Sequence, residues 1–421
     1  MEKLAIIGTG IAGMGAAYFL NDHFDITLFE KNDYPGGHTN TIKVDENGKD
    51  VFIDTGFMVF NKVTYPNLTK LFEELDVPIK PTSMSFSVNH VKSGLEYNGS
   101  GLNGLFSQRK NIFNPKFISM LVQINRFNQD CLEVLENRKY QNYSLKEYVD
   151  EKKYGNEMLE KYLIPMSSAV WSTPPDKMLG FPAKTLIRFF YNHGFLGLNT
   201  QHQWYTVVNG SRTYRDKLIE SFQDKIILNS KIEKVFRTKY KIEITTSDLK
   251  KYLFDKVIFA SHADETLKMI ENPTELENEL LSKFNYQYNK ATLHTDEKVM
   301  PLNKRVWSSW NYRIEEKESG VKTSAVYYMN SLQGVSKHKN YFVSIDDPGN
   351  IDPQKIIKEI DYTHPVFSVD AMEAQEKLNK INLQNNNTFF CGSYFKYGFH
   401  EDAFTSAVEL CNDLLGRKIW N

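Results

Sequence analysis

Residues 3–13 read Lys-Leu-Ala-Ile-Ile-Gly-Thr-Gly-Ile-Ala-Gly and carry the clearest indication of fold in the chain. The first five form an apolar run, which is typical of a parallel strand covered on both faces. Gly8, Gly10 and Gly13 follow with the G-x-G-x-x-G spacing of a dinucleotide-binding turn. The first glycine permits the tight turn, the second lets a pyrophosphate approach the backbone, and the third lets the next helix pack against the strand. The segment therefore predicts a nucleotide whose phosphates lie at a helix N-terminus.

The residues that follow complete a strand–helix–strand unit. Met14–Leu20 is apolar at helical spacing, and Asp25–Glu30 returns as a second strand. Glu30 at the end of that strand is placed to accept hydrogen bonds from ribose hydroxyls, and its charge would repel a 2′-phosphate. This context strengthens the glycine motif and disfavours NADP.

Three further segments favour FAD over NAD. Paired glycines in Pro35–Thr39 let the backbone lie against a long, extended ligand, and Ile53–Phe57 is a second segment of this kind. The third is Phe390–Tyr394, which continues into Gly398–Phe404. A helix that begins near Asp402 would point its N-terminus at the flavin pyrimidine, where charge develops on reduction. NAD sites have no use for such a C-terminal return, so we predict FAD.

The pattern of elements changes twice along the chain. Helical periodicity dominates from about residue 111 to 205, which indicates a helical insertion. Alternation returns in residues 226–260, in strands that we expect to rejoin the first sheet. Residues 284–345 alternate as in an antiparallel sheet, and a strand at Thr388–Cys391 precedes the closing helix.

We therefore predict an α/β fold with two domains. The first is a doubly wound, Rossmann-like FAD-binding domain, and the second is an α+β substrate domain with an antiparallel sheet and the helical insertion. The FAD-binding domain is discontinuous and consists of residues 1–80, 205–265 and 385–421. The substrate domain consists of residues 81–204 and 266–384.

At these motifs the chain resembles the flavin-dependent amine oxidase and phytoene desaturase superfamily, which implies an FAD domain of the glutathione reductase type. Within it, the chain is similar to FAD-dependent oxidoreductases associated with cyclopropane fatty acyl phospholipid synthases. The likeness covers essentially the whole chain. Its more specific segments are Met300–Pro301, Trp307–Tyr312, Met329–Gln333, His364–Phe367 and Gly398–Asp402.

The resemblance implies FAD contacts along the nucleotide motifs. Val235 is included because it follows the strand that normally offers its backbone to the adenine. The expected contacts are Gly8, Gly10, Ile11, Ala12, Gly13, Glu30, Lys31, Gly36, Gly37, His38, Thr39, Gly56, Phe57, Met58, Val235, Gly392, Ser393, Asp402, Ala403 and Phe404.

The chain also departs from the superfamily. Relatives commonly have an acidic residue after the glycine that corresponds to Gly392, whereas this chain has Ser393, so ribityl recognition is expected either to be weaker or to use the backbone. Position 403 is Ala where relatives frequently have Gly. Amine oxidases often tether the flavin through an upstream cysteine, but no cysteine lies between Cys131 and Cys391. We therefore predict non-covalent FAD.

Candidates for proton transfer lie near the expected flavin ring. His400 and Glu401 are polar residues at the start of the closing helix, and Tyr394 lies close before it. Carboxylates at a helix start are also preferred as caps and dipole partners, and this is our interpretation of Asp402. For the three candidates, a structural role remains open beside the catalytic one.

Two aromatic segments have more than one interpretation each. Trp307, Trp310 and Tyr312 alternate as a strand would, so one face either covers the flavin or belongs to an ordinary sheet core. Leu186–Leu198 either gates an apolar tunnel, contacts lipid, or is a buried helix.

Composition excludes several classes of protein. Lys plus Arg number 51 against 52 Asp plus Glu, so no electrostatic footprint for nucleic acid exists. The three cysteines show no C-x-x-C spacing, which argues against a disulfide framework or a metal site and indicates reduced thiols. No stretch approaches the ~20 apolar residues of a membrane span. We expect a cytoplasmic protein, with peripheral contact at the inner face of a membrane left open.

The sequence thus predicts an FAD-dependent oxidoreductase that performs a two-electron oxidation, with hydride transfer to flavin N5. By resemblance, the substrate is apolar, such as an unsaturated or methylated acyl chain of a phospholipid, and desaturation fits best. Amine oxidation is the alternative among enzymes. An FAD-containing isomerase, or a lipid-binding partner of a methyltransferase, is the alternative of another class.

Overall fold

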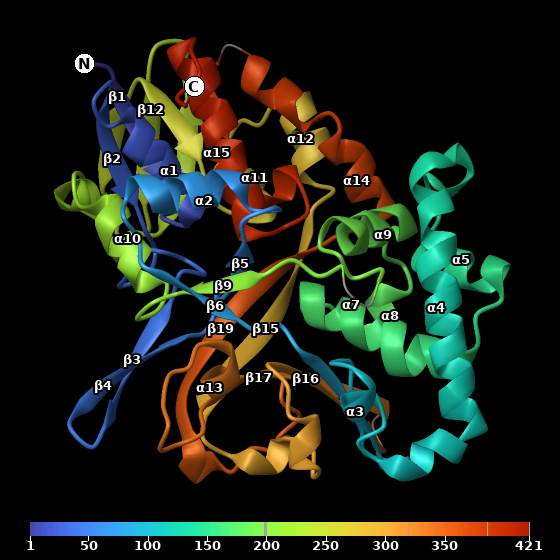
Figure 1. The fold of residues 1–421 in the computed structure, drawn as a ribbon. Coiled ribbons are helices and arrows are strands. Elements are labelled where there is room, and N and C mark those ends of the chain that lie inside the picture. Colours follow the sequence, from blue (N-terminus) through green and yellow to red (C-terminus); the bar gives the residue numbers. More distant parts are fainter. Residues whose placement is uncertain (198–199, 319, 385, 421) are drawn as a thin grey trace.

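The computed structural model describes residues 1–197, 200–318, 320–384 and 386–420 (Figure 1). Its first sheet is parallel throughout and has the strand order β10-β2-β1-β14-β20. This confirms the predicted doubly wound α/β architecture, because β1 lies inside the sheet with the chain winding away on both sides. The strands are β1 (Lys3–Ile7), β2 (Asp25–Phe29), β10 (Ile226–Ile227), β14 (Lys256–Phe259) and β20 (Thr388–Phe390).

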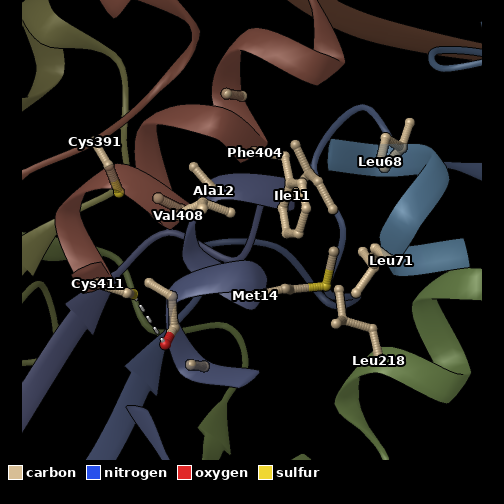
Figure 2. Close-up of a cluster of buried hydrophobic side chains, with 14 of the residues drawn as sticks. Ile11, Ala12, Met14, Leu68, Leu71, Leu218, Cys391, Phe404, Val408 and Cys411 are labelled. Carbon is tan, nitrogen blue, oxygen red and sulfur yellow. Dashed lines mark hydrogen bonds between the residues drawn. The ribbon is translucent and has the colours of Figure 1, made fainter. Parts of the chain in front are cut away.

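Helices from distant parts of the chain pack around α1 (Ile11–Leu20). They are α2 (Pro66–Glu74), α10 (Arg212–Ile219) and α15 (His400–Leu415). Figure 2 shows Met14 of α1 facing Leu71 and Leu218, with Phe404 and Val408 of α15 beside Ile11 and Ala12. The Sγ of Cys411 lies 3.9 Å from the carbonyl oxygen of Ala16. Helix α15 begins at His400, two residues before the predicted start.

A three-stranded antiparallel sheet corrects one expectation from the sequence. Strands β11 (Ile232–Arg237), β12 (Ile242–Thr246) and β13 (Lys251–Phe254) pair with each other and do not rejoin the first sheet. Their alternation buries one face only, which suits an antiparallel sheet, whereas a parallel strand inside a doubly wound sheet is buried on both faces. Of the segments expected to rejoin, only β10 and β14 do so.

The predicted antiparallel sheet is present as a seven-stranded sheet with the order β19-β15-β18-β17-β16-β7-β8. Its pairs are antiparallel except β16–β7, which is parallel. The strands are β7 (Phe86–His90), β8 (Leu95–Asn98), β15 (Asn285–His294), β16 (Trp310–Lys317), β17 (Gly320–Tyr328), β18 (Phe342–Ile345) and β19 (Ile356–Val366). Trp310 and Tyr312 lie in β16, but Trp307 precedes the strand and donates its indole N–H to the carbonyl oxygen of Pro301, so its predicted place in a strand is wrong.

Residues 102–192 form the helical part of the chain, which stands to one side of the long strands in Figure 1. Its helices are α3 (Leu102–Leu105), α4 (Pro115–Glu136), α5 (Leu145–Lys152), α6 (Asn156–Met158), α7 (Ile164–Trp171), α8 (Pro175–Met178) and α9 (Ala183–Asn192). Helix α9 buries Phe189 and Phe190, so the buried-helix reading of this segment holds up to residue 192. Residue 198, at the end of that predicted segment, is outside the described residues.

Smaller elements connect these layers. A hairpin of β3 (Thr41–Glu46) with β4 (Lys49–Asp54) projects outward at the lower left of Figure 1, and a three-stranded sheet in the order β5-β9-β6 lies between the two larger sheets. The latter strands are β5 (Phe60–Asn61), β6 (Ile79–Thr82) and β9 (Trp204–Val207). The remaining helices are α11 (Ala263–Met269), α12 (Glu275–Leu281), α13 (Met329–Leu332) and α14 (Val369–Gln375). Among the described residues, no helix has the length and apolar character to cross a membrane.

Candidate active site

A cavity of about 1280 Å³ extends from the glycine turn after β1 to a group of aromatic side chains. Its walls come from the carboxyl ends of β1, β2 and β14, from β19, and from the start of α15. Ligands of open α/β sheets bind outside the carboxyl ends of the strands, where the strand order reverses. The cavity therefore lies where the fold predicts a nucleotide.

The glycine turn is shaped by contacts that exclude side chains. Gly8 has a φ of +99°, and a Cβ added to Gly13 would lie 1.9 Å from the carbonyl oxygen of Gly8. Gly10 differs, because a Cβ there would meet no heavy atom within 4 Å. Its backbone thus borders open space at the N-terminus of α1, as a pyrophosphate requires.

The carboxylate of Glu30 is held in place beside this turn. Its Oε2 accepts hydrogen bonds from the backbone N–H and the hydroxyl of Thr9, at 3.1 and 2.5 Å. Its Oε1 accepts from the backbone N–H of Asn32 at 3.0 Å. The side chain lines the cavity, so a fixed acceptor for ribose hydroxyls is present next to the phosphate position.

Four histidines line the middle of the cavity: His38, His262, His364 and His400. The ring of His38 stacks on Tyr362 with centroids 4.7 Å apart, and lies 5.0 Å from the ring of His364. Burial lowers the pKa of His364 to about 4 and of His400 to about 3, and lowers the pKa of His38 well below its ordinary value. Burial also lowers the pKa of His262. At neutral pH the three deeply shifted rings are therefore uncharged.

His400 is anchored by two aromatic residues. Its Nε2 lies 2.5 Å from the hydroxyl of Tyr214, and its ring stacks on Phe57 at 3.9 Å between centroids. The hydroxyl of Tyr214 is also hydrogen-bonded to Thr39. This network fixes the first residue of α15 against the segment that contains Phe57.

The far end of the cavity is apolar. Trp171 and Phe189 stand 4.8 Å apart between ring centroids, and Phe399 stacks on Phe189 at 4.6 Å. The group at this end consists of aromatic and aliphatic side chains. Its members are Met84, Val170, Trp171, Phe189, Phe195, Trp204, Trp310, Tyr327 and Phe399.

Most residues expected to contact FAD line the cavity. They are Gly8, Gly10, Ile11, Ala12, Glu30, Lys31, Gly36, Gly37, His38, Gly56, Phe57, Met58, Gly392, Ser393 and Ala403. Of the catalytic candidates, His400 and Tyr394 also line it.

The other expected residues lie behind the wall. Gly13 packs on Gly8, Thr39 is bound to Tyr214, Val235 is in the core of the three-stranded sheet, and Phe404 covers α1. Asp402 accepts the backbone N–H of Phe399 at 2.9 Å and that of Tyr397 at 3.2 Å, so it caps α15 as interpreted from the sequence.

Glu401 is bound away from the cavity. Its two carboxylate oxygens accept the backbone N–H groups of Asn67 and Leu68, both at 2.9 Å. These are the first free donors of α2, so the side chain serves as a cap supplied from another helix.

The sequence did not predict several stretches of the wall, among them Asn32–Tyr34, Ser230–Glu233, Ala260–Ser261 and Lys358–Pro365. The first three follow the ends of β2, β10 and β14, and the carboxyl ends of parallel strands are the signal that could have found them. The resemblance includes His364 in one of its specific segments but implies no role for it in the site. Among the described residues, no cluster of His, Cys, Asp and Glu is arranged to hold a metal ion.

Residues 11–356 match the family model described as flavin containing amine oxidoreductase. The chain belongs to this family, and it is an FAD-dependent oxidoreductase. No curated protein matches the sequence.

Solved structures with the same fold cover nearly the whole chain. Wild-type putrescine oxidase bound to putrescine has 11% identity and a TM-score of 0.67, with 99% of each chain covered. Cyclohexylamine oxidase from Brevibacterium oxydans IH-35A has 12% identity and a TM-score of 0.68, covering 98% of this chain and 99% of its own. The CLA-producing fatty acid isomerase from P. acnes has 15% identity and a TM-score of 0.67, covering 99% and 98%. At these identities the likeness is one of fold.

Proposed function

We propose that this FAD-dependent oxidoreductase removes two electrons from an apolar substrate, and that the reaction is the desaturation of an acyl chain such as that of a phospholipid. When bound, FAD supplies the acceptor for the electron pair. The chain's own residues bind the substrate, exclude water and manage its proton.

The apolar end of the cavity carries this proposal. Its walls combine Trp171, Phe189 and Phe399 with other aromatic and aliphatic side chains, whereas the acidic residues that line the cavity come from other segments of the chain: Glu30, Asp33, Glu233, Glu265, Glu359 and Asp361. A hydrocarbon chain gains about 25 cal/mol for each Å² of apolar surface that such a wall removes from water. A charged substrate would lose its hydration without compensation.

Amine oxidation is the second candidate, because aromatic rings meet at right angles in the cavity. Trp310 and Tyr327 stand 5.4 Å apart with an interplanar angle of 89°. Such a wall accepts a neutral amine. Two of the similar folds are named as oxidases of amines, and a third as a fatty acid isomerase.

We also propose the FAD contacts given above, non-covalent binding, and the division into residues 1–80, 205–265 and 385–421 for FAD and residues 81–204 and 266–384 for substrate. Gly10 at the open helix N-terminus and the fixed carboxylate of Glu30 support the placement of the nucleotide. If the substrate is a phospholipid acyl chain, we also propose peripheral membrane contact and a functional link with a lipid methyltransferase.

The test is anaerobic bleaching of the bound flavin, followed by absorbance. Detergent-dispersed phospholipid with monounsaturated chains is expected to bleach the flavin, whereas putrescine and cyclohexylamine are not. Bleaching by the amines alone would replace desaturation with amine oxidation. No bleaching by any donor would favour the isomerase or binding role.

A matched pair of variants probes the apolar end. Phe195→Ala removes a side chain of the cavity wall, and Tyr191→Ala removes one that is 52% exposed and outside the wall. We expect the first to weaken lipid binding about tenfold, which corresponds to ~1.4 kcal/mol. The second is expected to leave binding unchanged.

A further inference from the structure

A chain of hydrogen bonds fixes the side chain of His364 from behind. Its Nδ1 lies 2.7 Å from Oδ1 of Asn289, whose Nδ2 donates to the carbonyl oxygen of Ser172 at 2.9 Å and to Oδ2 of Asp346 at 2.6 Å. Asn289 is 1% exposed. The backbone N–H of Lys290 donates to the other carboxylate oxygen of Asp346 at 2.8 Å.

The orientation of the Asn289 amide follows from chemistry. A backbone carbonyl can only accept a hydrogen bond, so the atom that faces Ser172 has to be the amide nitrogen. The oxygen of the amide then faces His364 and has to receive a hydrogen. The Nδ1 of His364 therefore carries the hydrogen of the neutral ring, and its Nε2 presents a bare lone pair.

Backbone geometry shows that this chain of groups is built in. Asp346 follows β18 with a φ of +56°, and Ser172 ends α7 with a φ of +49°. Both are left-handed conformations that residues with a Cβ adopt at a cost. Two separate segments thus adopt unfavourable conformations, and each of them places an acceptor within hydrogen-bonding distance of the Asn289 amide nitrogen.

The free edge of His364 faces the cavity. The residue lines the cavity wall, and among the described residues its Nε2 has no hydrogen-bond partner, yet it is not enclosed by protein atoms. On one side stands His38, next to the paired glycines expected to contact FAD. On the other, Ser172 adjoins Trp171 of the apolar end. His364 thus lies where the two ends of the cavity meet.

We propose that Nε2 of His364 is the proton acceptor of the oxidation. One hydrogen leaves the substrate with its electron pair, for which FAD is the oxidant, and the electron-poor centre that remains makes the neighbouring C–H bond acidic. That C–H bond breaks, its electron pair forms the new double bond of the product, and the proton joins the lone pair of Nε2. The imidazolium returns to neutral by releasing the Nε2 proton to water after product leaves. This inference rests on the proposed oxidation and assigns its base.

The surroundings keep His364 unprotonated, which leaves its lone pair free but makes it a weaker base than an exposed histidine, suited to a proton that has already become acidic. Its burial lowers its pKa to about 4, and the nearby His262 lowers it further in the same direction. The other titratable groups around it are His38, Tyr362 and, through Asn289, Asp346. The ring is neutral at pH 7, so the lone pair of Nε2 is unprotonated.

The first test reads the hydrogen position directly by ¹⁵N NMR of the FAD-bound protein labelled at histidine. The chain supplies two internal references. His193 donates from Nδ1 to the carbonyl oxygen of Phe189, whereas Nδ1 of His294 accepts the backbone N–H of Asp296, so its hydrogen is on Nε2. His364, identified from the spectrum of His364→Gln, is expected to match His193. A match to His294, or a charged ring at pH 7, overturns the inference.

The second test separates catalysis from structure. With a donor that bleaches the parent protein, His364→Gln is expected to slow flavin reduction about 10²- to 10⁴-fold, the range for loss of a general base. The flavin absorbance spectrum and the lipid dissociation constant are expected to stay unchanged. Asn289→Ala is expected to mix the two hydrogen positions of His364 and to slow reduction by less. Reduction of His364→Gln at the parental rate overturns the assignment of the base.

The two tests fail in different ways. If the protein oxidises lipid but His364 carries its hydrogen on Nε2, the proposed function is supported and the assignment of the base is wrong. If only amines bleach the flavin and the His364→Gln variant is still slow, the lipid substrate is wrong and the assignment of the base is supported.

Discussion

Glu401 of α15 bonds the backbone N–H groups of Asn67 and Leu68 at the N-terminus of α2, each at 2.9 Å. Helices more than 300 residues apart in the sequence are thereby joined by one carboxylate. This contact explains why Glu401 does not line the cavity, although its neighbour His400 does.

Replacing Glu401 by Gln is expected to lower the free energy of unfolding by roughly 1–3 kcal/mol, because one of two buried N–H groups loses its acceptor. The rate of flavin reduction is expected to change little. Urea unfolding and stopped-flow absorbance measure the two effects. Glu409→Gln on the same helix is the control, since Glu409 forms an exposed pair with Lys396 worth about 0–1 kcal/mol. A large loss of rate with full stability would return Glu401 to the catalytic residues.

Two alanine variants of the glycine turn are expected to differ in kind. Gly13→Ala places a Cβ 1.9 Å from the carbonyl oxygen of Gly8, so the protein is expected to lose about 1–3 kcal/mol of stability or more. Gly10→Ala meets nothing within 4 Å, so the fold is expected to stay intact while FAD affinity falls at least about tenfold. Thermal unfolding of the apoprotein and FAD titration measure these effects. Equal behaviour of the two variants would contradict the placement of the pyrophosphate.

Asp402 gives the stability a pH dependence of defined sign. Burial raises its pKa from 3.8 to about 7, although the backbone N–H of Phe399 opposes the shift. The folded state therefore binds the proton more tightly than the unfolded chain, and this stabilisation is complete below pH 4 and is lost as the pH rises to 7. Relative to Asp402→Asn, the parent is expected to lose a few kcal/mol over that window. Urea midpoints at several pH values test this, and parallel curves would refute it.

Because FAD is predicted to bind without a covalent link, the flavin is expected to leave the chain on denaturation. The cysteines are available as a check, since all three are buried and free, and burial raises the pKa of Cys391 to about 12. A thiol reagent at pH 8 is expected to modify none of them in the native protein and all three after denaturation. Acid precipitation is expected to leave yellow FAD in solution. Flavin fluorescence that stays with the precipitated chain would show a covalent link.

The parts of the fold that the sequence predicted are those with a local pattern. The apolar run of β1, the glycine turn and the start of α1 are contiguous, so spacing alone defines them. The place of β11 and β12 was mispredicted because alternation reports a half-buried strand and does not name its partner.

The base of the active site had no local signal. His364, Asn289, Asp346 and Ser172 come from β19, β15, the loop after β18 and the end of α7. Pairing of β15 with β19 sets Asn289 opposite Tyr362, two residues from His364, and only this register brings the amide to the ring. Likewise, Glu401 was a catalytic candidate because the sequence does not show that the N-terminus of α2 packs beside it and binds its carboxylate.

The strand order of the first sheet governs how the protein is made. Strand β1 is made well before its neighbour β14, which begins at Lys256, and before the next strand, β20, which begins at Thr388. The nascent chain has to wait with β1 and β2 lacking these partners while the ribosome adds some hundreds of residues, and pairings between such distant segments form slowly. The start of α15 supplies His400 and Ala403 to the cavity wall, so we expect FAD to bind only after this helix has been made and has packed against α1.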